Sequence, residues 1–150
     1  LSKKRKENSK ADILILEGWC CGAKQMKNNF LLKNINLLEK NQDKKYLWRK
    51  YYNNKLKYEY HDLFKMFDYK IFLKASSFKY VLNWRLKQEK MNKSNLNIQK
   101  KMDKKNLINF IQHYEKLTRW MLKNHITMFD LIIKVNNKQK IIAVNKNKIN

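Results

Sequence analysis

Glycine, proline, cysteine and acidic residues are all scarce in this sequence. Its 150 residues include 2 Gly, no Pro and 2 Cys, and 12 Asp and Glu stand against 35 Lys and Arg. The two cysteines, Cys20 and Cys21, are adjacent, which excludes a disulfide framework and a four-cysteine zinc site. No run approaches the roughly 18 apolar residues of a membrane span, and no apolar segment near the start indicates a signal peptide. We therefore expect a cytoplasmic, reducing compartment and no membrane partner.

The positive charge by itself does not predict a nucleic-acid partner. The formal net charge is +23, and clustered cations do release counterions from a phosphate backbone. Lys, Asn and Ile are all in excess, however, whereas Arg, which reads bases through bidentate contacts, is scarce. Asn and Ile carry no charge, so this excess is typical of an AT-rich coding sequence. A basic nucleic-acid-associated module is kept as a minor alternative.

The apolar residues, 43% of the chain, are numerous enough to build a core. Continuous apolar runs at 12–16, 69–74 and 129–135 predict strands, the first and third buried, and 140–144 predicts an edge strand. Apolar spacings of three and four predict helices. Three predicted helices span 36–41, 46–67 and 107–122, and a fourth begins after a cap at Ser76 or Ser77.

Strands that alternate with helices indicate an α/β fold, with a mainly parallel sheet and flanking helices. We expect residues 1–10 to form a basic flexible end and residues 11–150 to belong to one domain. Residues 92–103 are polar and are predicted to be mobile.

Glu17 follows the first predicted strand directly, in the sequence Glu17-Gly18-Trp19. In open α/β sheets, ligands bind outside the carboxyl ends of the strands. A carboxylate at that place can hold Mg²⁺ near a phosphoryl group that is being transferred. A glutamate in an ordinary turn gives the same pattern, and pattern alone favours that simpler interpretation.

The neighbouring stretch Gly18–Lys24 looks glycine-rich but is not a phosphate-binding loop. Such a loop requires G-x-x-x-x-G-K-[ST], so that backbone N–H groups surround the phosphates. Here the two glycines are one residue too close, Ala23 precedes the lysine and Gln25 follows it. The sequence therefore contains no phosphate loop.

The cysteines and histidines indicate neither redox nor metal chemistry. Adjacent cysteines bridge only with strain, so Cys20 and Cys21 are expected to be small buried thiols. His61, His113 and His125 show no metal-ligand spacing and are expected on the surface or on helices.

Arg85 and Glu89 lie one helical turn apart, which predicts either an ordinary ion pair or an arginine on a mobile lid. The polar stretch that follows slightly favours the lid. Arg119, near Tyr114 and Thr118 on the next predicted helix, is by default a surface arginine.

Five segments, taken in order, resemble one protein family. They read as its D-hydrophobic-EGWxxGA, N-x-L-E…D, WRxYxN, LKAPSFxxVxxWRxxQE and FxxHYExLT motifs. This combination is similar to the D-glycerate 3-kinase-like P-loop kinases, relatives of uridine kinase, phosphoribulokinase and pantothenate kinase. The five segments are Asp12–Lys24, Ile35–Asp43, Trp48–Asn53, Phe72–Glu89 and Phe110–Thr118.

The resemblance implies a P-loop kinase (P-loop NTPase) fold and an activity that uses ATP and Mg²⁺. The enzyme would phosphorylate a hydroxyl of D-glycerate or a similar small metabolite. It implies that Glu17 is catalytic and binds the metal, and that Arg85 acts in catalysis and ATP binding from a lid over 84–105. It further places Trp19, Trp48, Arg49 and Asn53 near the substrate, Arg49 as the partner of a carboxylate, and Gly18 and Arg119 on the ATP side.

The chain also departs from that family. The phosphate loop and the catalytic acidic segment precede the EGW strand in the family, and this sequence has neither. Ser76 stands in place of the proline of the fourth motif, and the leucine at position 1 fits a truncated sequence. We therefore interpret the chain as the rear portion of such a kinase, with the missing N-terminal half as its partner. An inactive remnant of a split or decayed kinase is the main alternative.

Overall fold

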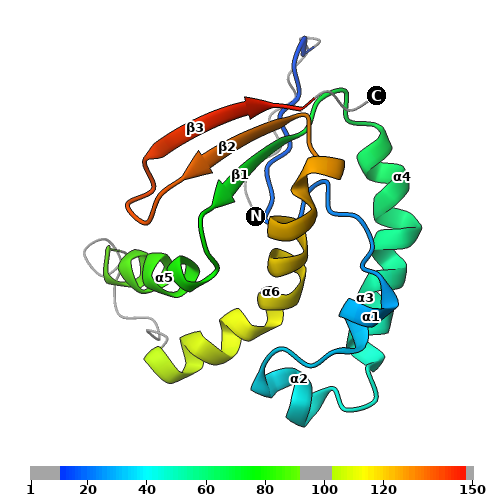
Figure 1. The fold of residues 1–150 in the computed structure, drawn as a ribbon, viewed down its shortest axis with the longest axis vertical. Helices are drawn as coiled ribbons and strands as arrows, with labels where there is room; N and C mark the ends of the chain where they lie inside the picture. Colours follow the sequence, from blue (N-terminus) through cyan, green and yellow to red (C-terminus); the bar gives the residue numbers. More distant parts are fainter. Residues whose placement is uncertain (1–10, 92–102, 148–150) are drawn as a thin grey trace, which may run out of the picture.

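The computed structural model describes residues 11–91 and 103–147 (Figure 1). The predicted basic end, most of the polar stretch and the middle of the predicted lid lie outside these residues. The elements in chain order are α1 (Asn28–Leu32), α2 (Leu37–Gln42), α3 (Leu47–Lys57), α4 (Glu59–Lys65), β1 (Ile71–Ala75), α5 (Lys79–Met91), α6 (Lys104–Asn124), the 3₁₀ turn η2 (His125–Thr127), β2 (Leu131–Val135) and β3 (Ile141–Lys146).

The three strands form one mixed sheet in the order β1-β2-β3. β1 and β2 are parallel, with Ile71 opposite Leu131, and α5 and α6 lie in the crossover between them. β3 follows β2 after a short turn and is antiparallel to it at the edge. The predictions of an α/β fold and of an edge strand near 140–144 are thus confirmed. The sheet is mixed rather than mainly parallel, because no helix separates β2 from β3.

α6 carries the widest apolar face and confirms the helix predicted over 107–122. Asp103 caps its start, where the carboxylate accepts a hydrogen bond from the backbone N–H of Asn106 (2.7 Å). Figure 1 shows α6 in the middle of the molecule, with α5 on one side and α3 and α4 on the other. Its buried apolar side chains are Leu107, Ile111, Leu117, Trp120 and Met121.

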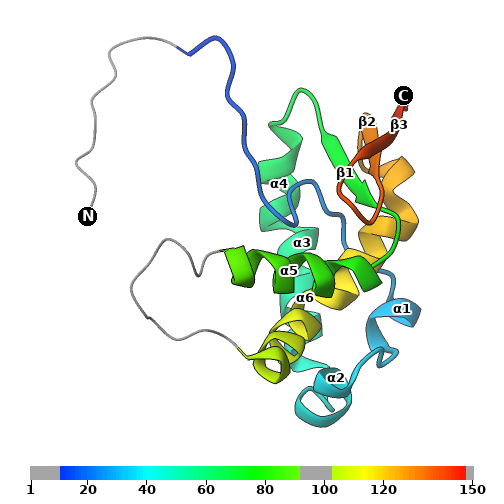
Figure 2. The ribbon, with the colours of Figure 1, turned by 90° about the vertical axis from the view of Figure 1, so that its left-hand side faces the viewer.

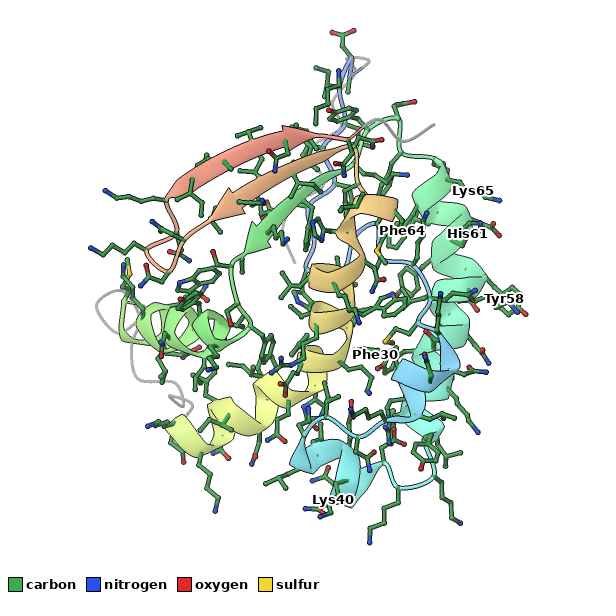
Figure 3. All side chains as sticks on the ribbon, in the orientation of Figure 1. Phe30, Lys40, Tyr58, His61, Phe64 and Lys65 are labelled. Atoms are coloured by element: carbon green, nitrogen blue, oxygen red, sulfur yellow. The ribbon has the colours of Figure 1, made fainter. Side chains whose placement is uncertain are left out.

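Aromatic side chains join α6 to the sheet and to the short helices. Phe72 of β1 stacks on Phe129 with ring centroids 4.6 Å apart, and Phe30 of α1 lies 5.4 Å from Trp120. Figure 3 shows Phe30 and Phe64 on the inner side of the α1–α4 layer, and Phe64 belongs to the same buried cluster. One core therefore connects the sheet, α6 and the helices of the first half.

The helix predicted over 46–67 is two helices. α3 ends and α4 begins at Tyr58, whose φ of −113° and ψ of −81° are not helical. The backbone N–H of Tyr58 still donates to the carbonyl of Asn54, and its own carbonyl accepts from Asp62. Because the apolar spacing continues across this break, the sequence pattern does not reveal it. Figure 3 shows Tyr58, His61 and Lys65 pointing away from the core.

The prediction of a buried strand at 12–16 is wrong. Residues 12–17 are extended but form no strand, and they make no backbone hydrogen bond with any described residue. Ile13, Leu14 and Ile15 are 79%, 91% and 85% exposed, and the segment runs outside the sheet (Figure 2). An apolar run is buried on both faces only where strands flank it and helices cover it. The described residues supply neither around this segment.

The predicted burial of the strand over 129–135 is confirmed only in part. β2 is the central strand and Ile132 is buried, but its other residues are only half-buried. β1, on the outer edge, leaves Ile71 and Leu73 more than half exposed. The apolar faces of the sheet are therefore only partly covered.

Candidate functional site

The turn after the extended segment attaches to α6 through Trp19. The indole Nε1 of Trp19 donates to Oγ1 of Thr118 at 3.0 Å, and its ring meets Tyr114 edge-on at 4.6 Å. Glu17, two residues earlier, is exposed and has no hydrogen bond or ion pair with a described residue. Its carboxylate is thus free to accept a ligand or a metal ion.

Gly22 closes this turn in a conformation that favours glycine. Its φ is +79°, and a Cβ atom at this position would lie 2.8 Å from Cε1 of Phe129. Close packing of the turn on the core therefore requires the absence of a side chain here. Gly18, predicted on the ATP side, is different, because the nearest atom to an added Cβ is only the Sγ of Cys21.

The two cysteines are free thiols. Both are half-buried rather than fully buried. Burial, and secondarily the neighbouring thiol of Cys21, raises the pKa of Cys20 above its ordinary value. A thiol whose pKa is raised is a poor nucleophile and a poor metal ligand at neutral pH.

Arg85 and Arg119 occupy neighbouring helices, and each pairs with a glutamate on its own helix. Arg85 lies 2.9 Å from Oε1 of Glu89, which confirms the ion pair predicted one turn apart. Its Nε is buried and has no hydrogen-bond partner in the described part of the chain. Arg119 lies 2.7 Å from Glu115 and places its guanidinium 5.2 Å from the ring centroid of Phe78. The expected assignment of Arg119 to the surface agrees with its half-exposed side chain.

Arg49 lies at the centre of a buried ion cluster, which we call the Arg49 cluster and which consists of Glu39, Asp43, Arg49 and Lys116. The guanidinium donates to Asp43 Oδ2 (2.7 Å from Nε), to the Asp43 carbonyl (2.7 Å) and to the Leu31 carbonyl (3.3 Å). It also lies 3.5 Å from Glu39 Oε2. The side chain is 2% exposed. Its partners within the chain therefore take most of the donors that a substrate carboxylate would need.

Lys116 completes the Arg49 cluster from α6. Its ammonium group donates to the carbonyls of Phe30 (3.1 Å) and Lys33 (2.6 Å) and lies 3.3 Å from Glu39 Oε2. Three donors thus meet three acceptors, which is what a lysine only 1% exposed requires. Burial lowers the pKa of Lys116, and the Glu39 carboxylate opposes that shift.

Asp43 is stabilised as a carboxylate within this cluster. Burial tends to raise its pKa, but hydrogen bonds from the Arg49 side chain and from the backbone N–H groups of Trp48 and Arg49 bring it below its ordinary value. Tyr52 shows the opposite effect. Burial and the nearby Glu39 carboxylate raise the pKa of its phenol, which stays protonated over the whole physiological range.

Asn53 holds the segment before α1 in place through hydrogen bonds. Its Oδ1 accepts from the backbone N–H of Met26 at 2.7 Å, and its Nδ2 donates to the Met26 carbonyl at 3.1 Å. The side chain is buried with both polar groups occupied. Trp48, by contrast, is 72% exposed, and its indole makes no hydrogen bond within the described residues. The substrate roles predicted for Trp48, Arg49 and Asn53 stay predictions, and only Trp48 presents free groups.

The predicted site residues fall into three groups, and no hydrogen bond, ion pair or ring contact joins a residue of one group directly to a residue of another in the described part of the chain. Glu17, Gly18 and Trp19 lie at the turn on α6, Arg85 and Arg119 lie on α5 and α6, and the third group surrounds Arg49. An indirect path joins the last two groups. Arg119 binds Glu115, and Glu115 accepts from Asn36, whose side chain also accepts from the backbone N–H of Glu39.

Sequence reasoning named Glu39 and Asp43 only as letters of a motif, and it missed Lys116 altogether. In a chain with 12 acidic residues, two acids within ten positions of an arginine were the available signal for a buried cluster. Nothing in the pattern around Lys116 distinguishes it from the other lysines, because its burial depends on contacts with residues far away in the sequence.

Residues 11–91 and 103–147 contain neither a metal-binding cluster nor a membrane span. No group of three or more His, Cys, Asp and Glu side chains is placed to hold a metal ion in these ranges. None of the helices there has the length and apolar character needed to cross a bilayer.

Comparison with known proteins identifies the fold through solved structures. No family model matches the sequence, and no curated protein matches it either. D-glycerate 3-kinase from Cryptococcus neoformans var. grubii matches 92% of this chain with a TM-score of 0.67 and 22% identity. The YGR205w protein matches 89% with a TM-score of 0.57 and 15% identity. The chain therefore has a glycerate kinase-like fold, and it spans 51% and 47% of the lengths of these two proteins.

Proposed function

We propose that this chain is part of a phosphotransferase that moves the γ-phosphoryl group of ATP to a hydroxyl of D-glycerate or a similar small hydroxy acid. The observation that carries the proposal is the likeness over 92% of the chain to a D-glycerate 3-kinase. The ordered motifs from Asp12 to Thr118 support it independently, because they depend on residue identities and not on the shape of the backbone.

In this proposal Glu17 binds Mg²⁺ and Arg85 approaches the ATP phosphates. Glu17 suits its role because its carboxylate is exposed and unpaired among the described residues, and carboxylate oxygens are preferred magnesium ligands. Arg85 suits its role because a half-exposed guanidinium can exchange Glu89 for a phosphate. The metal would neutralise charge on the transferred group, and the protein would position the acceptor hydroxyl.

The sequence contains no G-x-x-x-x-G-K-[ST], so this proposal takes the phosphate loop from polypeptide outside these 150 residues. We propose that the missing N-terminal half supplies it and covers the exposed apolar segment at 13–15. A strand added there could pair with backbone groups that have no hydrogen bond to a described residue, and it could cover the exposed side chains.

The decisive experiment measures ATP-dependent phosphorylation of D-glycerate by a protein in which this chain is joined to such a half. Glu17→Gln is expected to abolish turnover and leave the melting temperature unchanged, because the side chain is exposed and has no hydrogen bond or ion pair with a described residue. Glu59→Gln serves as the matched control, since Glu59 is also exposed and its one ion pair with a described residue is the surface pair with Lys55. Wild-type turnover in Glu17→Gln would refute the role of Glu17.

Two alternatives predict different results. An inactive remnant shows no turnover in any combination with a phosphate-loop half. A nucleic-acid-associated module binds DNA at low salt and loses affinity steeply as salt rises. Absence of binding at moderate salt would remove that second alternative.

A further inference from the structure

A cavity lies over the Arg49 cluster where α2, α3 and α6 meet. Its volume is about 290 Å³, close to the lower end of the range for small-molecule sites. Trp48 and Tyr52 of α3 form one wall, Leu38 and Glu39 of α2 a second, and His113 of α6 a third. Figure 3 shows Lys40 on α2, one of the helices that line the cavity. The cavity is thus a concave site whose wall combines aromatic rings with polar side chains, among them the carboxylates of Glu39 and Asp43.

The cations in and behind this cavity are already neutralised. Lys116 uses its three donors on two carbonyls and Glu39, and Arg49 donates to Asp43, Leu31 and Glu39. An anionic ligand would find no unpaired cation among the lining residues and would face the carboxylates of Glu39 and Asp43. A cationic ligand gains little either, because the two carboxylates of the Arg49 cluster are already balanced by Arg49 and Lys116. The charge balance therefore favours a neutral ligand.

Several polar groups of the wall have no hydrogen-bond partner among the described residues, the Gln42 amide and Nε2 of His113 included. Every hydrogen bond and ion pair of the Glu39 carboxylate uses Oε2. The other oxygen, Oε1, has no partner among the described residues, yet it is not sealed from solvent. The Tyr52 hydroxyl and the Trp48 indole N–H likewise have no partner there. Because its pKa is raised, Tyr52 keeps its proton and can donate it.

Hydroxyl groups match this set, since each one both donates and accepts without carrying charge. We propose that the cavity binds a small neutral polyol of monosaccharide size. One hydroxyl donates to Oε1 of Glu39, a second accepts from Tyr52, and the apolar face of the ligand lies against the exposed ring of Trp48. This proposal goes beyond phosphoryl transfer and does not depend on it.

Saturation-transfer difference NMR on the 150-residue protein, without ATP, tests the proposal with D-xylose and myo-inositol as probes. We expect ligand signals from at least one of them. Trp48→Ala should abolish the signals, because it removes the aromatic wall, and Tyr52→Phe should weaken binding about tenfold, because it removes one hydrogen bond. Tyr51→Ala is the matched control. It removes an exposed aromatic side chain from the same helix outside the cavity and should leave binding unchanged.

The melting temperature shows whether each variant is still folded. It is expected to be unchanged for Trp48→Ala, because the residue is 72% exposed. Absence of any signal with both polyols would overturn the proposal. So would unchanged binding in a folded Trp48→Ala protein, or stronger binding of D-glycerate or ethanolamine than of the polyols. Since the assay contains no phosphoryl donor, failure here leaves the proposed kinase function intact, and loss of kinase activity leaves this result intact.

Discussion

On one side of the molecule charged side chains are buried, and on the other side apolar side chains are exposed. Next to α2 and α3, the Arg49 cluster buries two cations and two carboxylates at less than 10% exposure. At the segment before Glu17, aliphatic side chains from Ile13 to Ile15 are 79–91% exposed. The buried charges have partners within the chain, whereas the exposed apolar residues are left uncovered by the residues that the structure describes. The second side is therefore suited to contact another polypeptide segment.

Arg49 provides the strongest test of this contrast. Arg49→Met should destabilise the fold by about 3–5 kcal/mol, because it leaves the carboxylates of Asp43 and Glu39 buried without their main partner. Urea unfolding measures the change. Lys50→Met, at the exposed neighbouring position, should leave the midpoint almost unchanged. Equal midpoints for both variants would show that the Arg49 cluster contributes little to stability.

Substitution of Gly22 measures how much close packing stabilises the turn between the two sides. Gly22→Ala should cost about 1–3 kcal/mol, because φ is positive and the new Cβ meets the ring of Phe129. Gly18→Ala is the control and should cost less, since only the movable Sγ of Cys21 stands in its way. Thermal melts of the two variants compare them directly. A larger loss in Gly18→Ala would contradict the packing described for the turn.

Substitution of Leu14 tests the side with the exposed apolar segment. It should change the free energy of unfolding least. Leu14→Asp is expected to change the free energy of unfolding by no more than about 0.5 kcal/mol, because the side chain is 91% exposed. The same variant should reduce aggregation, measured by light scattering. Ile132→Ala, in the core, should instead cost about 2–5 kcal/mol. A large loss of stability in Leu14→Asp would mean that the segment packs on the chain.

The sequence predicted the elements whose stabilising contacts are mostly local. The apolar stripe on α6 lies at regular spacing, and the short helix predicted at 36–41 is α2, whose cap at Asn36 the structure adds, with Oδ1 accepting from the backbone N–H of Glu39 at 3.0 Å. The break at Tyr58 was missed because the apolar spacing continues through it. The run at 12–16 was assigned to a buried strand because pattern cannot tell whether a neighbouring strand exists.

The candidate site was predicted less well than the fold. The motif around Trp48 and Arg49 did not show that Arg49 is buried in an ion cluster and that Trp48 is exposed at a cavity. That difference depends on Lys116 and on backbone carbonyls of the α1 region. The spacing of residues along the sequence does not reveal contacts between residues that are far apart in it.

The length of chain that Lys116 bridges has a consequence for the order of folding. Its ammonium group meets carbonyls 86 and 83 residues earlier in the sequence. A loop of that size has a closure entropy that local helices do not have to overcome. We therefore expect α3 and α6 to gain helical structure first and the ammonium group to reach its carbonyls late. An interaction formed after the rate-limiting step acts on the unfolding rate, so Lys116 slows the opening of the folded chain rather than speeding its formation.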